Sequence, residues 1–141
     1  MLAAGLVASS AAILLALGAI HLVYTFRGPK LTPRDAALKS SMSATAPVIS
    51  RETTMWRAWI GFNASHGLGV ILFGLVYGYL ALVHPGLLFR SAFLLAVGFM
   101  VLGSYALLAR AYWFSVPFRA LLIALACYAA GVVAGIASGL S

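Results

Sequence analysis

Two of the three histidines in this sequence lie inside long apolar stretches, where a polar side chain is costly and needs an explanation. His21 follows twenty uncharged residues, and His66 lies in a second apolar stretch, three residues after Asn63. A helix would place Asn63 and His66 on one face. Imidazole and amide groups can hold the polar head of a ligand, handle protons or bind a metal ion. For either histidine, a hydrogen bond across a helix bundle is the simpler alternative.

Aromatic and basic residues accompany these polar residues at helical spacing. Trp56 precedes Asn63 by two helical turns, and Tyr24 follows His21 by three residues, so each shares a face with its neighbour. Arg57 would stand near the entrance of a site built from these faces. The candidate ligand-binding residues are His21, Tyr24, Trp56, Arg57, Asn63, His66 and Tyr105.

The composition predicts the kind of element that must position these residues. Of the 141 residues, 64% are hydrophobic and 8% are charged, whereas a soluble domain is about half apolar and about a quarter charged. The chain is therefore predicted to be an integral membrane protein, and its spans must be helical because unpaired backbone groups are too costly in lipid. We predict a single all-α domain, a four-helix transmembrane bundle, with spans at about 2–26, 58–83, 91–109 and 118–140.

The basic residues are distributed unevenly around the predicted spans. Eight of the nine Lys and Arg residues lie in or beside loop 27–57 and the loop after the third span, and only Arg90 lies on the other side. By the positive-inside rule, these two loops are cytoplasmic and both termini are outside. The net charge of +7 is thus assigned to membrane topology rather than to nucleic-acid binding.

The long first loop contains a helix-start pattern. Thr32 can cap a helix, Pro33 suits the first helical position, and Asp35 lies where a capping box places its acid. A short interfacial helix from Pro33 to about Ser43 is therefore predicted, with Ser50 restarting a helix that continues into the second span. The loop is either a solvated connector or a lid over a site.

The polar residues of the four spans fall at a similar predicted depth. Counted from the flanking cytoplasmic arginine at about 1.5 Å per residue, they lie roughly 7–13 Å into the membrane. They are His21, Asn63, His66, Ser104, Tyr105, Cys127 and Tyr128. The outer half of the spans holds Tyr77 but no histidine or amide. Apolar walls with a few convergent polar groups are typical of ligand pockets, so this layer predicts a site for the head of a lipid-like or quinone-like molecule.

Small residues recur at a spacing of four in two spans. The pairs Gly74/Gly78 and Gly131/Gly135 would let helices approach closely. They are predicted either to pack inside the bundle or to form a surface for a membrane-protein partner or a second copy of the chain.

No catalytic signature is present in the sequence, so whether the protein is an enzyme stays open. The spans carry no paired carboxylates, and the chain has no His-x-x-x-His, Cys-x-x-Cys or glycine-rich phosphate loop. A metal site could use His21, His66 and Cys127 for Cu(I) or Zn(II), although a fourth ligand is missing. A haem would need the two histidines on opposite faces of a porphyrin. An accessory subunit of a larger membrane complex, without catalysis of its own, is the remaining alternative.

Several stretches resemble a family of small bacterial four-helix membrane proteins. They are GAIHLVYTF from Gly18, TPRD from Thr32, TTMWRAWIGFNASHG from Thr53 and FGLVYGYL from Phe73. The resemblance extends to about residue 85 and continues in hydropathy alone. It implies the four-helix fold, the bacterial cytoplasmic (inner) membrane and the importance of the segments around His21 and His66. The family has no established activity and so implies no ligand.

Overall fold

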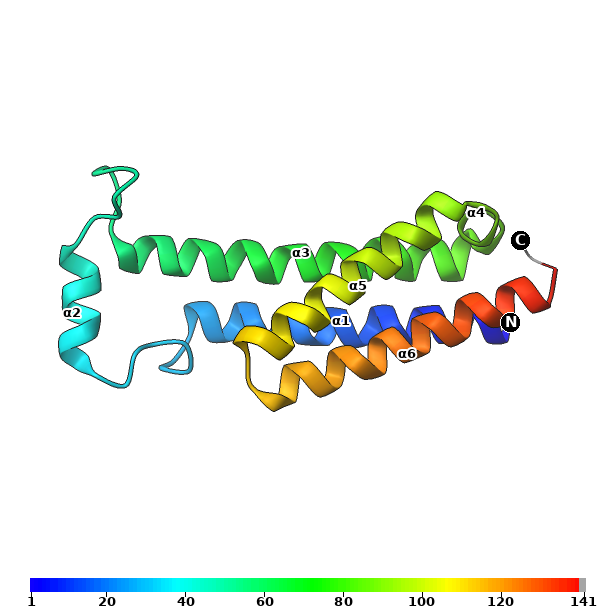
Figure 1. The fold of residues 1–141 in the computed structure, drawn as a ribbon, viewed down its shortest axis with the longest axis horizontal. Helices are drawn as coiled ribbons and strands as arrows, with labels where there is room; N and C mark the ends of the chain where they lie inside the picture. Colours follow the sequence, from blue (N-terminus) through cyan, green and yellow to red (C-terminus); the bar gives the residue numbers. More distant parts are fainter. Residues whose placement is uncertain (140–141) are drawn as a thin grey trace. The chain divides into compact units, whose positions relative to one another are not determined.

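The computed structural model describes residues 1–139, which form helices and connecting segments without a strand. Four helices are long and apolar enough to cross a membrane (Figure 1): α1 (Leu2–Phe26), α3 (Met55–Val83), α5 (Ala92–Tyr112) and α6 (Ser115–Ala137). Two short helices are α2 (Ala36–Ala44) and α4 (Pro85–Arg90). The predicted all-α four-helix bundle is confirmed. The last residue of the fourth predicted span, Leu140, lies outside the described residues.

The helix ends differ from the predicted span ends by a few residues. Helix α3 begins at Met55, α5 continues to Tyr112, and α6 begins at Ser115. The extensions of α3 and α5 add aromatic and basic residues, because the backbone remains helical beyond the apolar segment where long polar side chains can reach the interface. Hydropathy locates the apolar segment that lies in lipid, but it does not show where the backbone helix begins and ends.

The start of α2 corrects the prediction for the long loop. Asp35 is the N-cap, and its carboxylate accepts a hydrogen bond from the backbone N–H of Ala37 at 2.8 Å. The Thr32 hydroxyl instead donates to the carbonyl of Pro29 at 2.7 Å and caps nothing. The helix therefore begins at Ala36 rather than Pro33. Asp is as good an N-cap as Ser or Thr, so the pattern allowed either register.

The predicted helix restart at Ser50 is also wrong. The Ser50 hydroxyl accepts a hydrogen bond from the backbone N–H of Glu52, which closes a local turn rather than a helix. Thr54 is the residue that precedes α3, and its hydroxyl accepts from the backbone N–H of Arg57 at 3.3 Å. The chain turns at residues 45–54 before α3 begins, and the Met55 N–H bonds to the carbonyl of Thr45 at the end of α2.

Helix α4 is an element that the sequence did not predict. Pro85 ends α3 as expected, but it also occupies the first turn of a new short helix, where its missing N–H is not needed. Leu88 and Phe89 of α4 are buried. The segment between the second and third spans is thus a packed corner rather than a solvated loop.

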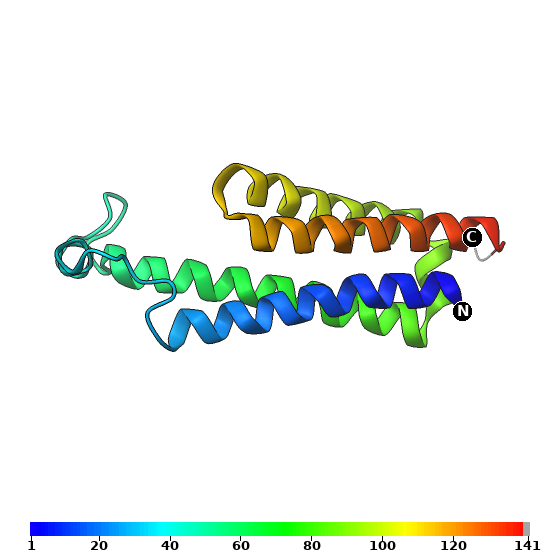
Figure 2. The same cartoon turned by 90° about the horizontal axis from the view of Figure 1, so that it is seen from below.

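The chain divides into two compact units, which are described in turn. The first contains residues 1–17 and the described residues from 70 onward. Within it, α5 and α6 pack side by side as a helical hairpin (Figures 1 and 2). Tyr77 and Tyr128 lie in its core, with their ring centroids 5.8 Å apart and their hydroxyls donating to the carbonyls of Leu94 and Leu95. Tyr128 is therefore a partner of Tyr77, although depth alone grouped it with the histidines.

Glycines let the helices of this first unit approach closely. A Cβ on Gly74 would lie 2.5 Å from the Leu15 side chain and 2.8 Å from the Ala11 carbonyl oxygen of α1. Gly131 of α6 faces Val7 of α1 in the same way, and Gly135 faces the Phe89 ring of α4. Gly78 also faces Ala11. Of the two predicted roles of the glycine pairs, the structure shows packing against the chain's own helices.

The second unit contains residues 18–69. It consists of the last part of α1, the connector, α2 and the first half of α3. His21, Asn63 and His66 all belong to this unit.

Candidate functional site

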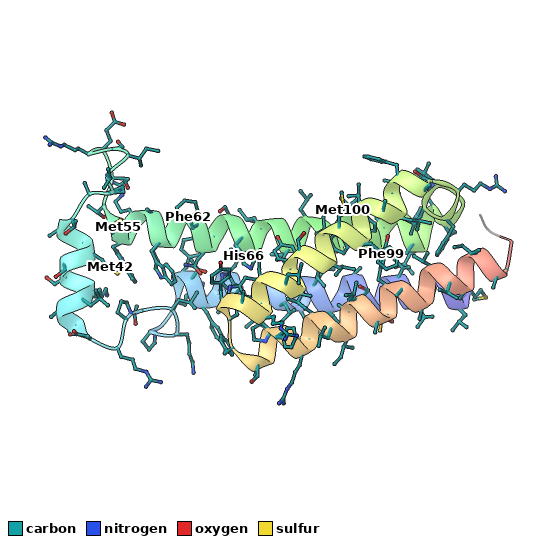
Figure 3. The ribbon with its side chains drawn as sticks, in the orientation of Figure 1. Met42, Met55, Phe62, His66, Phe99 and Met100 are labelled. Atoms are coloured by element: carbon teal, nitrogen blue, oxygen red, sulfur yellow. The ribbon has the colours of Figure 1, made fainter. Side chains whose placement is uncertain are left out.

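The two membrane histidines meet in the second unit. His21 of α1 and His66 of α3 have ring centroids 5.1 Å apart and ring planes at 74°, which is an edge-to-face contact. Both residues are half-buried. Figure 3 shows His66 on the side of α3 that meets α1, whereas Phe62, one turn earlier, points away and is 74% exposed. Two residues 45 positions apart are thus brought into one polar cluster.

A close approach of α1 and α3 makes this contact possible. Gly67, next to His66, has no side chain, and a Cβ there would lie 3.0 Å from the Leu22 side chain and 3.4 Å from the Gly18 carbonyl oxygen. Gly67 is buried as a result. Small residues at a crossing are the usual means by which membrane helices come together, and here they hold the neighbouring histidines in contact.

Asn63 is the third polar member of the cluster. Its amide nitrogen donates to the carbonyl of Trp59 at 2.8 Å, and its side chain lies beside the His21 ring. The Nε2 atom of His21 is buried and has no hydrogen-bond partner among the described residues. A buried polar atom without a partner costs on the order of 1–3 kcal/mol, so His21 is held in place by its surroundings despite an unsatisfied nitrogen.

A hollow of about 340 Å³ lies nearer the end of the same helices. Its walls come from the end of α1, the connector, α2 and the first turns of α3. They are formed by Thr25, Phe26, Gly28, Leu31, Thr32, Lys39, Trp56 and Ile60. Thr25 lines the hollow and bonds within its own helix, where its hydroxyl donates to the backbone carbonyl of His21 at 2.8 Å.

Two tryptophans fix the walls of this hollow. The Trp59 indole N–H donates to the carbonyl of Leu31 at 2.9 Å and ties α3 to the connector. The Lys39 ammonium lies 5.2 Å from the centre of the Trp56 ring, within the range of a cation–π contact between α2 and α3. Gly28 has a φ of 80°, a conformation that favours glycine, and this turn directs the chain away from α1 into the connector.

The structure brings together some of the predicted site residues and separates others. His21, Asn63 and His66 form the cluster, and Trp56 lines the hollow. Tyr24 and Arg57 are exposed, and neither lines the hollow. Tyr105 and Cys127 belong to the first unit, where Tyr105 lines a shallow depression along α5 with Met100, Val101, Ser104 and Leu108.

Three polar wall residues, Thr25, Thr32 and Lys39, were not among the predicted site residues. Thr25 lies four residues after His21, a spacing that places it on the same face, yet the sequence analysis selected Tyr24 at three residues. Lys39 and Thr32 line the hollow because the segment between α1 and α3 folds beside it. No periodicity within one helix could have identified them.

The contact between the histidines also bears on the haem and metal alternatives. A porphyrin with His21 and His66 as axial ligands would have to lie between two rings that touch, so this arrangement is not the one in the structure. Among residues 1–139, no three side chains of the His, Cys, Asp and Glu types are grouped so that they could hold a metal ion.

Fold and composition together define a class of protein. Four apolar helices of membrane-spanning length fit a multi-pass integral membrane protein. No protein-family model, curated protein or solved structure matches the chain.

Proposed function

We propose that the protein binds an amphiphilic molecule, lipid-like or quinone-like, whose polar head lies in the hollow of the second unit. The observation that supports this most is the position of the hollow at the end of two apolar helices, with two threonines, a lysine and a tryptophan in its walls. A head in the hollow would leave the tail in lipid beside α1 and α3. Pockets for such molecules combine apolar walls with a few polar groups.

The polar cluster supports the same proposal from the membrane side. Thr25, which lines the hollow, lies four residues after His21 on the same helix face, and the buried Nε2 atom of His21 has no hydrogen-bond partner within residues 1–139. A head that extends past Thr25 would meet this cluster first. His21, Asn63 and His66 therefore remain candidate ligand contacts in the proposed site.

The test is the mass of non-protein molecules bound to the purified protein. Native mass spectrometry from mild detergent is expected to show a bound amphiphile, reduced at least severalfold in Trp56→Ala and in His21→Ala. Phe114→Ala is the matched control, because Phe114 is an interfacial aromatic residue that is 70% exposed and lies in the other unit. Equal occupancy in all four proteins, or no bound amphiphile in the wild type, would overturn the proposal.

A second candidate function is binding of a transition-metal ion by His21 and His66. It is favoured by two imidazoles in contact and by the unpartnered Nε2 atom, because imidazole suits zinc and copper. Elemental analysis after loading with Zn(II) or Cu(II) is expected to show one ion per chain, lost in His66→Gln. Retention in His84→Gln is the control, since His84 is exposed and lies at the opposite end of α3. Metal content that follows His84 instead would end this candidate.

A further inference from the structure

The only charge in the walls of the hollow is positive. Lys39 is the only ionisable side chain among the residues that line it, and none of them is acidic. The connector and helix ends around it, residues 27–57, hold six of the nine basic residues and both acids of the chain. One of those acids, Asp35, directs its carboxylate to the backbone at the start of α2. An occupant of the hollow therefore meets a positive environment.

The hydrogens of the two hydroxyl groups in the walls are engaged within the protein. The hydroxyls of Thr25 and Thr32 donate to backbone carbonyls at 2.8 and 2.7 Å. The indole N–H of the neighbouring Trp59 donates to Leu31 in the same way. The Lys39 ammonium, by contrast, carries three N–H donors and lies over a ring face that takes none of them in a conventional hydrogen bond. The side chain best able to receive a head group is thus a cationic donor.

The position of Lys39 is set by its element. Asp35 caps α2 one turn before it, and the cation–π contact with Trp56 holds the ammonium beside the hollow. The residue itself is exposed, so the ammonium stays hydrated and carries no burial penalty. At a membrane interface, each such lysine contributes about 1 kcal/mol of attraction to an anionic lipid surface.

We infer that the hollow selects an amphiphile with an anionic, phosphate-bearing head and that Lys39 determines this selection. The inference rests on the proposed function, because it names the class of ligand that the same hollow takes. A phosphate head supplies several acceptor oxygens and a negative charge, which matches a wall with a cationic donor and no acid. An uncharged quinone supplies acceptors but no charge.

The test measures lipid preference in nanodiscs of phosphatidylcholine that contain one fifth phosphatidylglycerol. Native mass spectrometry of the ejected protein is expected to show phosphatidylglycerol enriched over its share, with the enrichment falling about fivefold in Lys39→Gln. Lys39→Arg keeps the charge and is expected to retain most of the enrichment. Lys30→Gln is the matched control, since Lys30 is exposed, carries the same charge and does not line the hollow.

The possible outcomes separate this inference from the proposed function. An equal fall in phosphatidylglycerol enrichment in Lys39→Gln and Lys30→Gln would overturn the role of Lys39, because a general charge effect would explain both. Binding of phosphatidylcholine or an uncharged quinone without preference would overturn the inference and leave the proposed function standing. Absence of any bound lipid would overturn both. Displacement of the lipid by inorganic phosphate alone would reassign the site to free phosphate, whereas its failure to compete supports a lipid head.

Discussion

Two tyrosine side chains in the spans are held by carbonyls of a neighbouring helix. Tyr77 donates to the carbonyl of Leu94 at 2.7 Å, and Tyr128 donates to that of Leu95 at 3.1 Å. Tyr128 is fully buried, and its ring also meets Phe99 edge to face. Interhelical bonds of this kind stabilise membrane bundles by roughly 0.6–2 kcal/mol each. The two tyrosines therefore join α3 and α6 to α5.

Replacing Tyr128 with phenylalanine tests this contribution. Tyr128→Phe removes the hydroxyl but keeps the ring, so the free energy of unfolding is expected to fall by roughly 0.6–2 kcal/mol. The measurement is reversible unfolding in mixed detergent micelles. Tyr112→Phe is the control, because Tyr112 is 79% exposed, and it should leave the stability unchanged. A comparable fall in both variants would show that the hydroxyl bond to Leu95 is not the cause.

The sequence predicted the residues of the polar cluster better than those of the hollow. His21, Asn63 and His66 were found because a polar side chain in an apolar span is rare, and scarcity alone makes it visible. Thr25 and Lys39 were not found. A threonine is unremarkable near a helix end, and Lys39 reaches the hollow only because the connector folds back toward α3. Contacts that depend on a connector leave no periodic signal.

At the scale of the elements, glycines decide how closely the helices of the first unit pack. The small-residue spacing was visible in the sequence, but its partners were not, because a spacing within one helix does not say which helix faces it. In the structure, Gly74 and Gly78 of α3 face α1. Gly103 in α5, by contrast, has nothing within 4 Å of the position that a Cβ would take.

These two kinds of glycine give opposite expectations for the same substitution. Gly74→Ala would force a Cβ against Leu15 and the Ala11 carbonyl, so it is expected to lower the free energy of unfolding by about 1–3 kcal/mol. Gly103→Ala meets open space and is expected to be neutral or to raise stability by up to about 1 kcal/mol. Thermal unfolding in one detergent would compare them. An unchanged midpoint in Gly74→Ala would mean that α1 and α3 can separate at that point without cost.

The start of α2 gives a second prediction at this scale. Asp35→Ala removes the N-cap and is expected to destabilise α2 by about 1 kcal/mol. Amide hydrogen exchange of residues 36–44 should then become about fivefold faster. Thr32→Ala should leave the exchange unchanged, because Thr32 bonds to Pro29 and not to the helix. The reverse result would restore Thr32 as the cap.

At the scale of the whole molecule, most of the predicted architecture followed from the composition. A chain that is 64% hydrophobic and 8% charged must place its few charges at the ends of apolar segments, so the four spans could be delimited to within a few residues. Helix α4 and the true bounds of α2 could not be delimited this way, because both lie where polar and apolar residues mix. The likeness to small bacterial membrane proteins stays a prediction, as does the orientation in the membrane.

The predicted orientation in the membrane rests on the uneven distribution of the few basic residues, and it can be tested directly. The chain has a single cysteine, Cys127, so Cys127→Ser provides a background for one new cysteine at a time. Val48→Cys lies in the connector and Leu87→Cys in α4, and both positions are exposed. With both termini outside, an impermeant maleimide should label Leu87→Cys in intact bacterial cells that express the protein and Val48→Cys only after permeabilisation. If Val48→Cys were labelled first, the basic connector would face outward. The hollow with Lys39 would then meet the outer leaflet, so the same experiment also establishes which leaflet would supply the proposed ligand.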